Sequence, residues 1–505
     1  RKIPVNLSEL LQIESLGPKR IKVLYQELGI RNQEDLKKAV RTHKIRDLQG
    51  FGEKSERKIL EALKFQDSSP KRFLLGSVFS IIKNLTEVLK KSGFFDRLEP
   101  AGSFRRRQET LGDIDILATS KNPARAMDFF VKNTGAVAVL AHGSTKSEVR
   151  LSSGVQVDLR IVPEDSWGAA LQYFTGDKSH NIKLRKIAIE KGMKLSEYGL
   201  TPHNPPSQGG KRRGVSAIKN EEEIYKTLGM DFIPPELRTD SGEIEAASRQ
   251  ARGKPGGLPK LINYGDVRGD LQVQTNWTDG SSSIEQMAQA AMKLGREYIA
   301  ITDHTKALAM THGLDEKKLL KQMKEIERVN ADFRMQNADF RILKGSEVDI
   351  LKDGRLDLAD HVLAKLDVVG VSIHSHFNLS RQDMTQRLVR ALSNPHVDIF
   401  FHPTTRLINR RKPIDFDFAE ILKICKKNKV ALEINSFPDR LDIHDTLIRE
   451  AVAAGVKLVI NTDAHSPKHL EFMHFGEAQA RRGWASKNDV LNTKPLGELL
   501  KYLKK

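Results

Sequence analysis

Two aspartates at alternate positions of a short apolar stretch are the strongest chemical signal in the sequence. Asp113 and Asp115 lie in "GDIDILAT", where the alternation predicts a strand with both carboxylates on one face. Asp158, in the alternating segment "VQVDLRIV", can join them from a neighbouring strand. Carboxylates this close repel unless a cation lies between them, and Mg²⁺ prefers oxygen ligands. The pattern predicts a site for two Mg²⁺ ions, or for Mn²⁺ in their place.

The residues just before the aspartates are suited to phosphate. Gly102 and Ser103 begin a turn whose N–H and hydroxyl groups can bind phosphate, and Arg106 adds positive charge. Three carboxylates with two metal ions can activate an attacking hydroxyl and steady a triphosphate leaving group. This combination predicts nucleotidyl transfer.

The segment "AGSFRRRQETLGDIDIL", together with "YFTGDKSHNIKLR" at residues 173–185, resembles family X DNA polymerases of the polymerase β superfamily. The resemblance implies that the second segment closes over the incoming nucleotide and that Tyr173 disfavours a 2′-hydroxyl by crowding. The chain departs from the family at Asp177, where a small or hydroxyl residue is commoner, and at Leu111, where the family can place a serine. The implied nucleotide-binding residues are Gly102, Ser103, Arg106, Gly112, Tyr173, Phe174, Gly176, Asn181 and Arg185.

Two similar units precede this region, at residues 10–30 and 45–63. Each has the pattern helix, tight turn with glycine, helix, which is the helix-hairpin-helix grip on the DNA backbone. The net charge of the chain is +18, and residues 1–262 carry most of it, which favours a polyanionic partner on this half. The predicted DNA contacts are Gly17, Lys19, Gly50, Gly52, Lys54, Arg57 and Lys58.

The second half of the chain alternates strands with amphipathic helices, and each strand ends in a polar residue that can ligate a metal. This pattern predicts a β/α barrel. It resembles the polymerase and histidinol phosphatase (PHP) domain that is fused to family X polymerases in bacteria and archaea. The resemblance implies a phosphoesterase site for three Mn²⁺ or Zn²⁺ ions with nine ligand positions. These positions are Gln272, Gln274, Asp279, His304, Glu347, His374, His402, Asp463 and His465.

Glutamine stands at the first two of these positions, where the family has histidine. A neutral amide oxygen is a poorer ligand for Mn²⁺ or Zn²⁺ than an imidazole nitrogen. In the family the two missing histidines serve one metal together with Glu347 and Asp463. We therefore expect a 3′–5′ nuclease that is reduced or lost, with a working nuclease as the alternative. The ligands of the other two metals are intact, Glu347, His374 and His402 for one and Asp279, His304 and His465 for the other.

Other histidines of this half are predicted to lie on the surface, among them His361, His396 and His469. For His376 the sequence allows two roles, a contact to the substrate or support of a metal ligand.

The expected fold is an α/β multidomain chain. A helix-hairpin-helix segment over residues 1–75 precedes a nucleotidyltransferase palm with a mixed sheet over 76–165 and a small α+β thumb over 166–247. A linker over 248–262, rich in Gly, Pro and charge, leads into a distorted β/α barrel over 263–505. By the resemblance, the family's N-terminal domain with its 5′-phosphate pocket would precede Arg1, so lyase activity is not expected here.

The expected function is template-directed DNA synthesis at gaps during repair. The implied partners are gapped or primer–template DNA and deoxynucleoside triphosphates. The chain is expected to act as a monomer and to bind no membrane. The chain has a single cysteine, Cys425, which excludes an internal disulfide framework and is typical of a protein in a reducing compartment. We therefore expect a cytoplasmic protein that works at the nucleoid. Two alternatives are a nuclease that uses the first half only to hold DNA, and a non-catalytic DNA-binding scaffold. The scaffold predicts eroded carboxylates, which the first site does not show.

Overall fold

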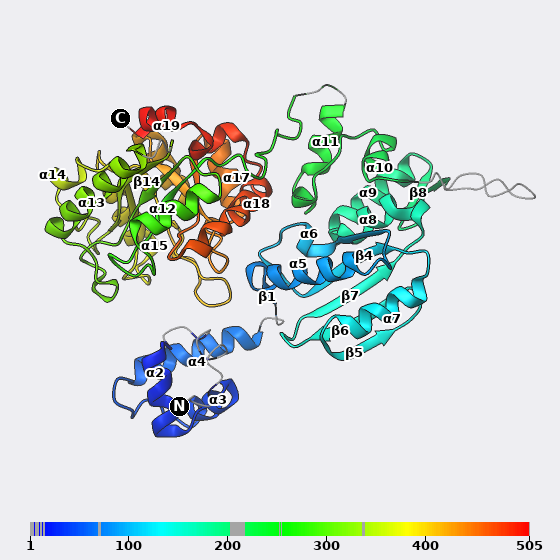
Figure 1. Cartoon of the computed structure of the whole chain (residues 1–505), viewed down its shortest axis with the longest axis horizontal. Helices are drawn as coiled ribbons and strands as arrows, with labels where there is room; N and C mark the ends of the chain where they lie inside the picture. Colours follow the sequence, from blue (N-terminus) through cyan, green and yellow to red (C-terminus); the bar gives the residue numbers. More distant parts are fainter. Residues whose placement is uncertain are drawn as a thin grey trace, which may run out of the picture. The chain divides into compact units, whose positions relative to one another are not determined.

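The structure is a computed structural model of the chain. It describes all residues except 1–4, 6–9, 11–12, 14–15, 69–71, 203–217, 252, 254, 336–338 and 504–505. The chain divides into two compact units, one of residues 1–72 with 404–414 and the other of residues 73–403 with 415–505 (Figure 1).

Residues 18–68 of the first unit are mainly helical, and tight turns connect the helices. Gly29 ends the first of them in the left-handed conformation, and Asn32 caps the next by accepting a hydrogen bond from Asp35 N. Apolar side chains from all three helices, such as Leu24, Leu36 and Ile59, are buried in a common core. The helices are α2 (Pro18–Leu28), α3 (Gln33–Arg41) and α4 (Glu53–Ser68).

The palm is built on a mixed sheet whose described strands have the order β2-β4-β7-β6-β5. Strand β4 pairs in parallel with β7, and the other pairs are antiparallel. Helix α7 packs on β5, β6 and β7 (Figure 1). The elements are β1 (Phe73–Leu74), α5 (Leu75–Lys91), β2 (Arg97–Pro100), α6 (Gly102–Arg105), β3 (Thr110–Leu111), β4 (Asp113–Thr119), α7 (Pro123–Asn133), β5 (Ala136–His142), β6 (Lys146–Leu151) and β7 (Gln156–Ile161).

The thumb is a small α+β body that follows the palm. Asp177, one of the departures from the family pattern, caps the N-terminus of α9 by accepting a hydrogen bond from His180 N at 2.9 Å. Apolar side chains such as Leu184 and Tyr225 form the core. The elements are η1 (Glu164–Ser166), α8 (Trp167–Thr175), α9 (Lys178–Glu190), β8 (Met193–Ser196), β9 (Gly199–Pro202), α10 (Glu222–Thr227), η2 (Pro235–Leu237) and α11 (Glu243–Ala251).

A buried carboxylate ties the thumb to the palm helix α6. Glu221 accepts hydrogen bonds from Arg105 Nη2 at 2.5 Å and from Arg238 Nη1 at 2.6 Å. The Arg238 side chain is fully buried. Burial opposes ionisation of Glu221, but the charges of Arg238 and Arg105 outweigh it and lower its pKa to about 2. The three side chains therefore form a charged brace that fixes α6 in place.

The second half of the chain forms a nearly closed barrel. Its described strands have the order β10 to β16 without interruption and are all parallel, and a parallel bridge from Val273 to Ala464 joins the two ends. The strands are β10 (Gly269–Val273), β11 (Tyr298–Ile301), β12 (Arg341–Asp349), β13 (Val368–Ser372), β14 (Ile399–Phe400), β15 (Ala431–Asn435) and β16 (Leu458–Asn461).

Helices surround these strands (Figure 1), so the strands are buried on both faces and their sequences are almost continuously apolar. Close packing leaves no room at Gly370, where a Cβ atom would lie 1.8 Å from the Phe401 ring. The helices are α12 (Ile284–Lys293), η3 (Ala309–Thr311), α13 (Glu316–Met335), α14 (Asp360–Leu363), α15 (Arg381–Leu392), α16 (Phe418–Asn428), α17 (Asp445–Ala454), η4 (Pro467–Phe472), α18 (Met473–Arg482), η5 (Lys487–Asp489), η6 (Leu491–Thr493) and α19 (Leu496–Leu503).

The predicted fold class is confirmed, with a helical first segment, a mixed palm sheet, an α+β thumb and a distorted β/α barrel. Among the described residues, no helix is both long enough and apolar enough to cross a membrane.

The Glu221 brace predicts a pH-dependent loss of stability. The pKa of Glu221 is lower in the folded chain than in the unfolded one, so its contribution is complete above about pH 4.5 and is lost as the pH falls toward about 2. Glu221→Gln leaves Arg238 buried without its counter-charge. We expect it to lower the free energy of unfolding at pH 7 by about 3 kcal/mol.

Urea unfolding at pH 7 and pH 3.5 measures this effect. The difference between Glu221→Gln and the parent should shrink at the lower pH. Glu222→Gln, at the exposed neighbouring position, is the matched control and should unfold like the parent. An equal difference at both pH values would contradict the assigned role of the Glu221 charge.

Candidate active sites

The three palm aspartates lie together on two neighbouring strands. Asp115 of β4 is directly opposite Asp158 of β7 in the parallel register, and Asp113 is opposite Gln156. Paired residues in a sheet project from the same face, and so do residues two apart on one strand. The structure therefore brings Asp113, Asp115 and Asp158 to one face of the sheet.

The electrostatics of this face favour a bound cation. Burial, followed by repulsion from Asp113 and Asp158, raises the pKa of Asp115 to about 7. Burial also raises the pKa of Asp158, although Gln156 Nε2 donates a hydrogen bond to its Oδ1 at 2.8 Å. Carboxylate oxygens that repel one another in this way match the ligand preference of Mg²⁺. The residues present therefore fit the metal that the sequence predicts.

The turn that carries Gly102 and Ser103 packs against the central aspartate. Gly102 has φ +56°, and a Cβ atom there would lie 2.1 Å from Asp115 Oδ2, so only glycine fits. Ala101 N donates to Asp115 O at 2.8 Å, which fixes the turn beside β4. Ser103 is half-buried in the following helix α6. Gly112 directly precedes the first aspartate, between β3 and β4.

Arg106 connects this turn to the "YFTG" segment. Its Nη1 donates to Thr175 O, while its Nε is buried and has no hydrogen-bond partner among the described residues. Gly176 lies directly against it, because a Cβ atom there would be 3.3 Å from Arg106 Nη1. An unpaired guanidinium N–H beside the carboxylates is suited to a nucleotide phosphate.

The remaining nucleotide candidates lie on α8 and α9. Asn181 Nδ2 donates to Tyr173 O at 2.7 Å, and the Arg185 guanidinium lies 5.8 Å from the centre of the Tyr173 ring. Phe174 packs under Arg160 at 4.8 Å and lines a cavity of about 70 Å³ that also contacts Asp115 and Asp158. The structure thus places "YFTG" beside the carboxylates.

Sequence reasoning did not identify Gln156, Arg160 or Lys146 as part of this region. Gln156 and Arg160 are spaced by two from Asp158 along β7, so the alternation that placed Asp158 on the active face places them there as well. Lys146 reaches the cavity from β6, and no local spacing indicates that contact.

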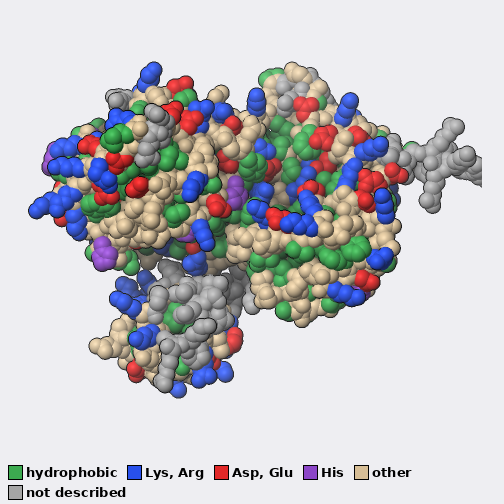
Figure 2. Space-filling view, in the orientation of Figure 1, with side chains coloured by type: hydrophobic (Ala, Val, Ile, Leu, Met, Phe, Trp, Pro, Cys, Tyr) green, Lys and Arg blue, Asp and Glu red, His purple; other side chains and the backbone are tan. Residues whose placement is uncertain are grey.

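The two hairpins present their predicted contacts on the surface of the first unit. Gly17 precedes α2, and Gly50 adopts φ +82° in the turn before α4, where Gly52 O accepts from Ser55 N. Lys19, Lys54, Arg57 and Lys58 are exposed. Figure 2 shows Lys and Arg side chains at several separate places on this unit.

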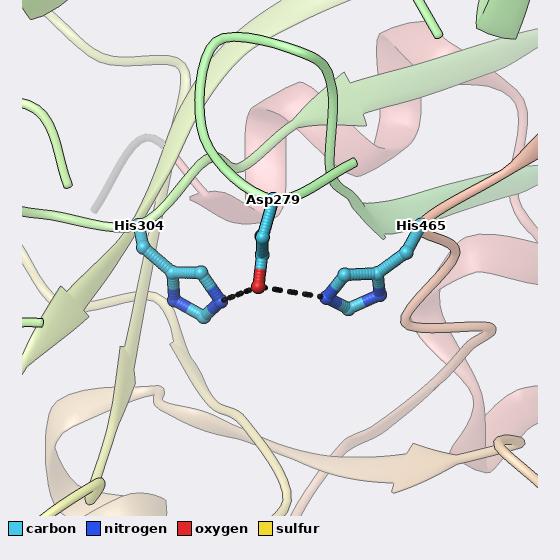
Figure 3. Close-up of side chains that lie close together, drawn as sticks. All are labelled: Asp279, His304 and His465. Atoms are coloured by element: carbon cyan, nitrogen blue, oxygen red, sulfur yellow. Dashed lines mark ion pairs between the residues drawn. The ribbon is translucent and has the colours of Figure 1, made fainter. Parts of the chain in front are cut away.

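The barrel gathers its nine predicted positions at the carboxyl ends of the strands, on loops or on the last residues of a strand. Asp279 Oδ2 lies 3.6 Å from His304 Nε2 and 3.5 Å from His465 Nε2, so these three side chains converge on one point (Figure 3). His304, Glu347 and His374 form a second compact group. Two of the three implied metal positions are thus matched by compact groups of suitable donors.

The grouping differs in detail from the family assignment. His402 Nε2 contacts Glu347 Oε1 at 2.8 Å, and His374 Nε2 contacts the same oxygen at 3.2 Å. His304 is shared between the two compact groups, while His402 lies outside them.

The carboxylates around two of these histidines favour the protonated, cationic form of the ring. Burial opposes protonation of His374, but hydrogen bonds to Asp349 and Glu347 raise its pKa to about 9. Burial likewise opposes protonation of His465, and Asp279 and Asp463 raise its pKa to about 9. A metal at these groups therefore competes with protons for the ring nitrogens.

The two glutamines do not fit a metal in the arrangement that the structure shows. Gln272 Nε2 donates to Glu347 Oε2 at 3.0 Å, and Gln274 Nε2 donates to the same oxygen at 2.8 Å. Amide nitrogens are donors and bind no cation. The third implied metal position is therefore filled by hydrogen bonds, and Asp463 is left without its expected partners.

Several residues around this site were missed by the sequence analysis. Glu433 and Asn435 are two apart on β15, which is the same spacing as in the palm, and both are fully buried inside the barrel. Burial and the nearby Asp463 raise the pKa of Glu433 well above its usual value. Arg440 lies 3.4 Å from Asp463 Oδ2, and its loop carries no recognisable signal.

His469, predicted to lie on the surface, has a supporting contact that the sequence did not indicate. Its ring is half-buried between Phe437 and Phe472, and its Nδ1 accepts a hydrogen bond from His465 N at 3.2 Å. It therefore supports the loop that carries a metal-site histidine. His361 and His376 are exposed, and His396 is half-buried.

Three protein families match parts of the chain. The matches are SAM-like helix-hairpin-helix tandem over residues 7–64, DNA polymerase beta thumb over residues 170–239 and PHP domain over residues 270–437.

Known proteins match the chain over both halves. A probable phosphatase of Thermoanaerobacter sp. is 30% identical over 44% of this chain and 88% of its own length. DNA polymerase lambda of Arabidopsis thaliana is 30% identical over 27% of this chain and 31% of its own length. A crystal structure of Leishmania infantum polymerase beta covers 46% of this chain and 97% of its own, at 22% identity and a TM-score of 0.30, which is too low for a conclusion.

One relative spans the whole chain. The DNA polymerase/3′-5′ exonuclease PolX of Bacillus subtilis is 40% identical over 100% of this chain and 86% of its own length. With the palm carboxylates, the thumb and the barrel in one polypeptide, the chain belongs to the PolX family, the family X DNA polymerases that carry a PHP domain.

Proposed function

We propose that this polymerase fills short gaps during DNA repair and that the nuclease of its PHP domain is reduced or lost. The observation that carries the synthetic activity is the register of β4 and β7, which sets Asp115 abreast of Asp158 with Asp113 on the same face. When bound there, Mg²⁺ or Mn²⁺ supplies activation of the primer hydroxyl and neutralisation of the triphosphate charge.

The side chains around the carboxylates have distinct roles in this proposal. Asp158, held by Gln156, faces the primer 3′-hydroxyl, and Arg106 offers its buried Nε to the triphosphate. Tyr173 and Asn181 hold the sugar and base of the incoming nucleotide.

The partners follow from the charges and from the hairpins. Gapped or primer–template DNA binds through backbone phosphates at the two hairpin turns, and the incoming nucleotide is a deoxynucleoside triphosphate. We propose that the chain acts as a monomer in the cytoplasm.

A working 3′–5′ exonuclease is the second candidate for the barrel. The convergence of Asp279, His304 and His465 on one point favours it, because this group can still hold a metal. The glutamines favour the reduced activity, since they remove two imidazoles from the site.

Removal of the third carboxylate should nearly abolish synthesis. Asp158→Ala takes away the group nearest the primer hydroxyl, and we expect extension of a gapped primer to fall by roughly 10²–10⁴-fold. Binding of gapped DNA should stay near the parent value. Asp165→Ala, at an exposed position of η1, is the matched control. Normal extension by Asp158→Ala would rule out its assigned role.

Neutralising the second hairpin should weaken DNA binding for every sequence. In the triple variant Lys54→Gln, Arg57→Gln and Lys58→Gln, each lost phosphate contact should reduce the slope of log affinity against log salt by about 0.9. The control variant neutralises the same number of charges on α13, at the exposed Lys317, Lys321 and Lys324. If the two triple variants had equal slopes of log affinity against log salt, Lys54, Arg57 and Lys58 would be exposed to solvent without contacting DNA phosphates.

Restoring the two imidazoles should raise nuclease activity. The double variant Gln272→His and Gln274→His should degrade a labelled single-stranded primer from its 3′ end in Mn²⁺ at least about tenfold faster than the parent. His374→Ala added to this variant should abolish the gain. Vigorous degradation by the parent, lost on His374→Ala, would favour the second candidate.

A further inference from the structure

The amide nitrogens of Gln272 and Gln274 converge on a single oxygen of Glu347. Their distances to Oε2 are 3.0 and 2.8 Å, and both side chains are 0% exposed. Two carbonyl oxygens at these distances would repel the carboxylate, so the nitrogen of each amide must face it. One oxygen of Glu347 is therefore fully engaged without a cation.

A divalent cation would require both amides to turn their oxygens toward it and give up these hydrogen bonds. The oxygen of Gln272 already lies 3.3 Å from Asn435 Nδ2, so turning Gln272 would break a second interaction as well. Gln272 is thus held in the donor orientation from both sides, whereas Gln274 is held by its amide nitrogen alone, because its Oε1 is buried without a hydrogen-bond partner among the described residues.

The other carboxylate of this metal position is also compensated. Asp463 Oδ2 lies 3.2 Å from Asn435 Nδ2 and 3.4 Å from Arg440 Nε. Burying a carboxylate without a counter-charge or hydrogen bonds is costly, and a guanidinium with an amide donor offsets part of that cost.

We propose that Gln272, Gln274, Asn435 and Arg440 together replace a divalent cation between Glu347 and Asp463. The hydrogen bonds of these side chains occupy the metal position, so no metal binds there. A site that had only lost ligands would still bind a metal weakly. This inference rests on the proposed function of the barrel as a reduced phosphoesterase and gives its physical cause. The remaining metal capacity lies with two groups, Asp279, His304 and His465 for one and His304, Glu347 and His374 for the other.

Metal content tests the replacement directly. The palm is first silenced by Asp113→Asn and Asp115→Asn, so that Mn²⁺ is counted only at the barrel. The chain is stripped with EDTA, saturated with Mn²⁺, passed through gel filtration and assayed by mass spectrometry. The variant Gln272→His and Gln274→His should hold one Mn²⁺ more per chain than the same background with glutamines. Equal counts would overturn the proposal.

Thermal unfolding tests the donor role of the amides. Gln274→Glu replaces the donor with a carboxylate of the same shape, so it should lower the unfolding temperature in EDTA, and Mn²⁺ should restore it by more than it stabilises the parent. Gln274→Met removes the donor without adding charge and should show the same loss without that recovery. Identical responses of the two variants to Mn²⁺ would overturn the proposal.

The nuclease assay separates this inference from the proposed function. A parent chain that holds one Mn²⁺ fewer than the histidine variant, yet degrades primers equally fast, would overturn the reduced nuclease and support the replacement. A parent that holds as many Mn²⁺ ions as the histidine variant but has no nuclease activity would overturn the replacement and support the reduced nuclease.

Discussion

A buried carboxylate must be matched by positive charge or by hydrogen-bond donors, and both sites of this chain depend on that requirement. In the palm the protein supplies too little positive charge to stabilise Asp115 as an anion. Arg106 and Arg160 lower the pKa of Asp115, but burial and the two neighbouring aspartates prevail and raise it to about 7. The strand register that sets Asp115 beside Asp158 therefore creates a demand that a divalent cation satisfies.

In the barrel, side chains of the protein itself supply the positive charge and the hydrogen-bond donors that Glu347 needs. Burial opposes ionisation of this side chain, but His304, His374 and His402 hold its pKa well below the usual value, and two amides donate to its other oxygen. A carboxylate that is already stabilised as an anion gains less from a cation than one that repels its neighbours. The two halves of one chain thus combine a carboxylate group whose repulsion calls for a cation with a carboxylate that the protein itself stabilises as an anion.

The parts of this arrangement that follow from strand geometry could be predicted from the sequence. Alternation places Asp113 and Asp115 on one face, and ligand-type residues after successive strands indicate the barrel site. The parts that depend on side-chain orientation could not be predicted. Which atom of Gln272 faces Glu347 is decided by Asn435, more than 160 positions away in the sequence, and Arg440 reaches Asp463 from a loop without a motif.

The choice of glutamine itself can be argued from the neighbours of Glu347. The replacement must reach a fully buried oxygen, donate a hydrogen bond and add no bulk, because the strands around it are packed on both faces. A lysine or arginine would bring a full charge close to the protonated His374, and an apolar residue would leave the carboxylate oxygen without a donor. An amide on a long side chain satisfies all three conditions, and two of them supply two neutral donors where the family has a metal with its two imidazoles. In the proposed replacement, the same two residues take the place of a metal and stabilise the carboxylate that the metal would have bound.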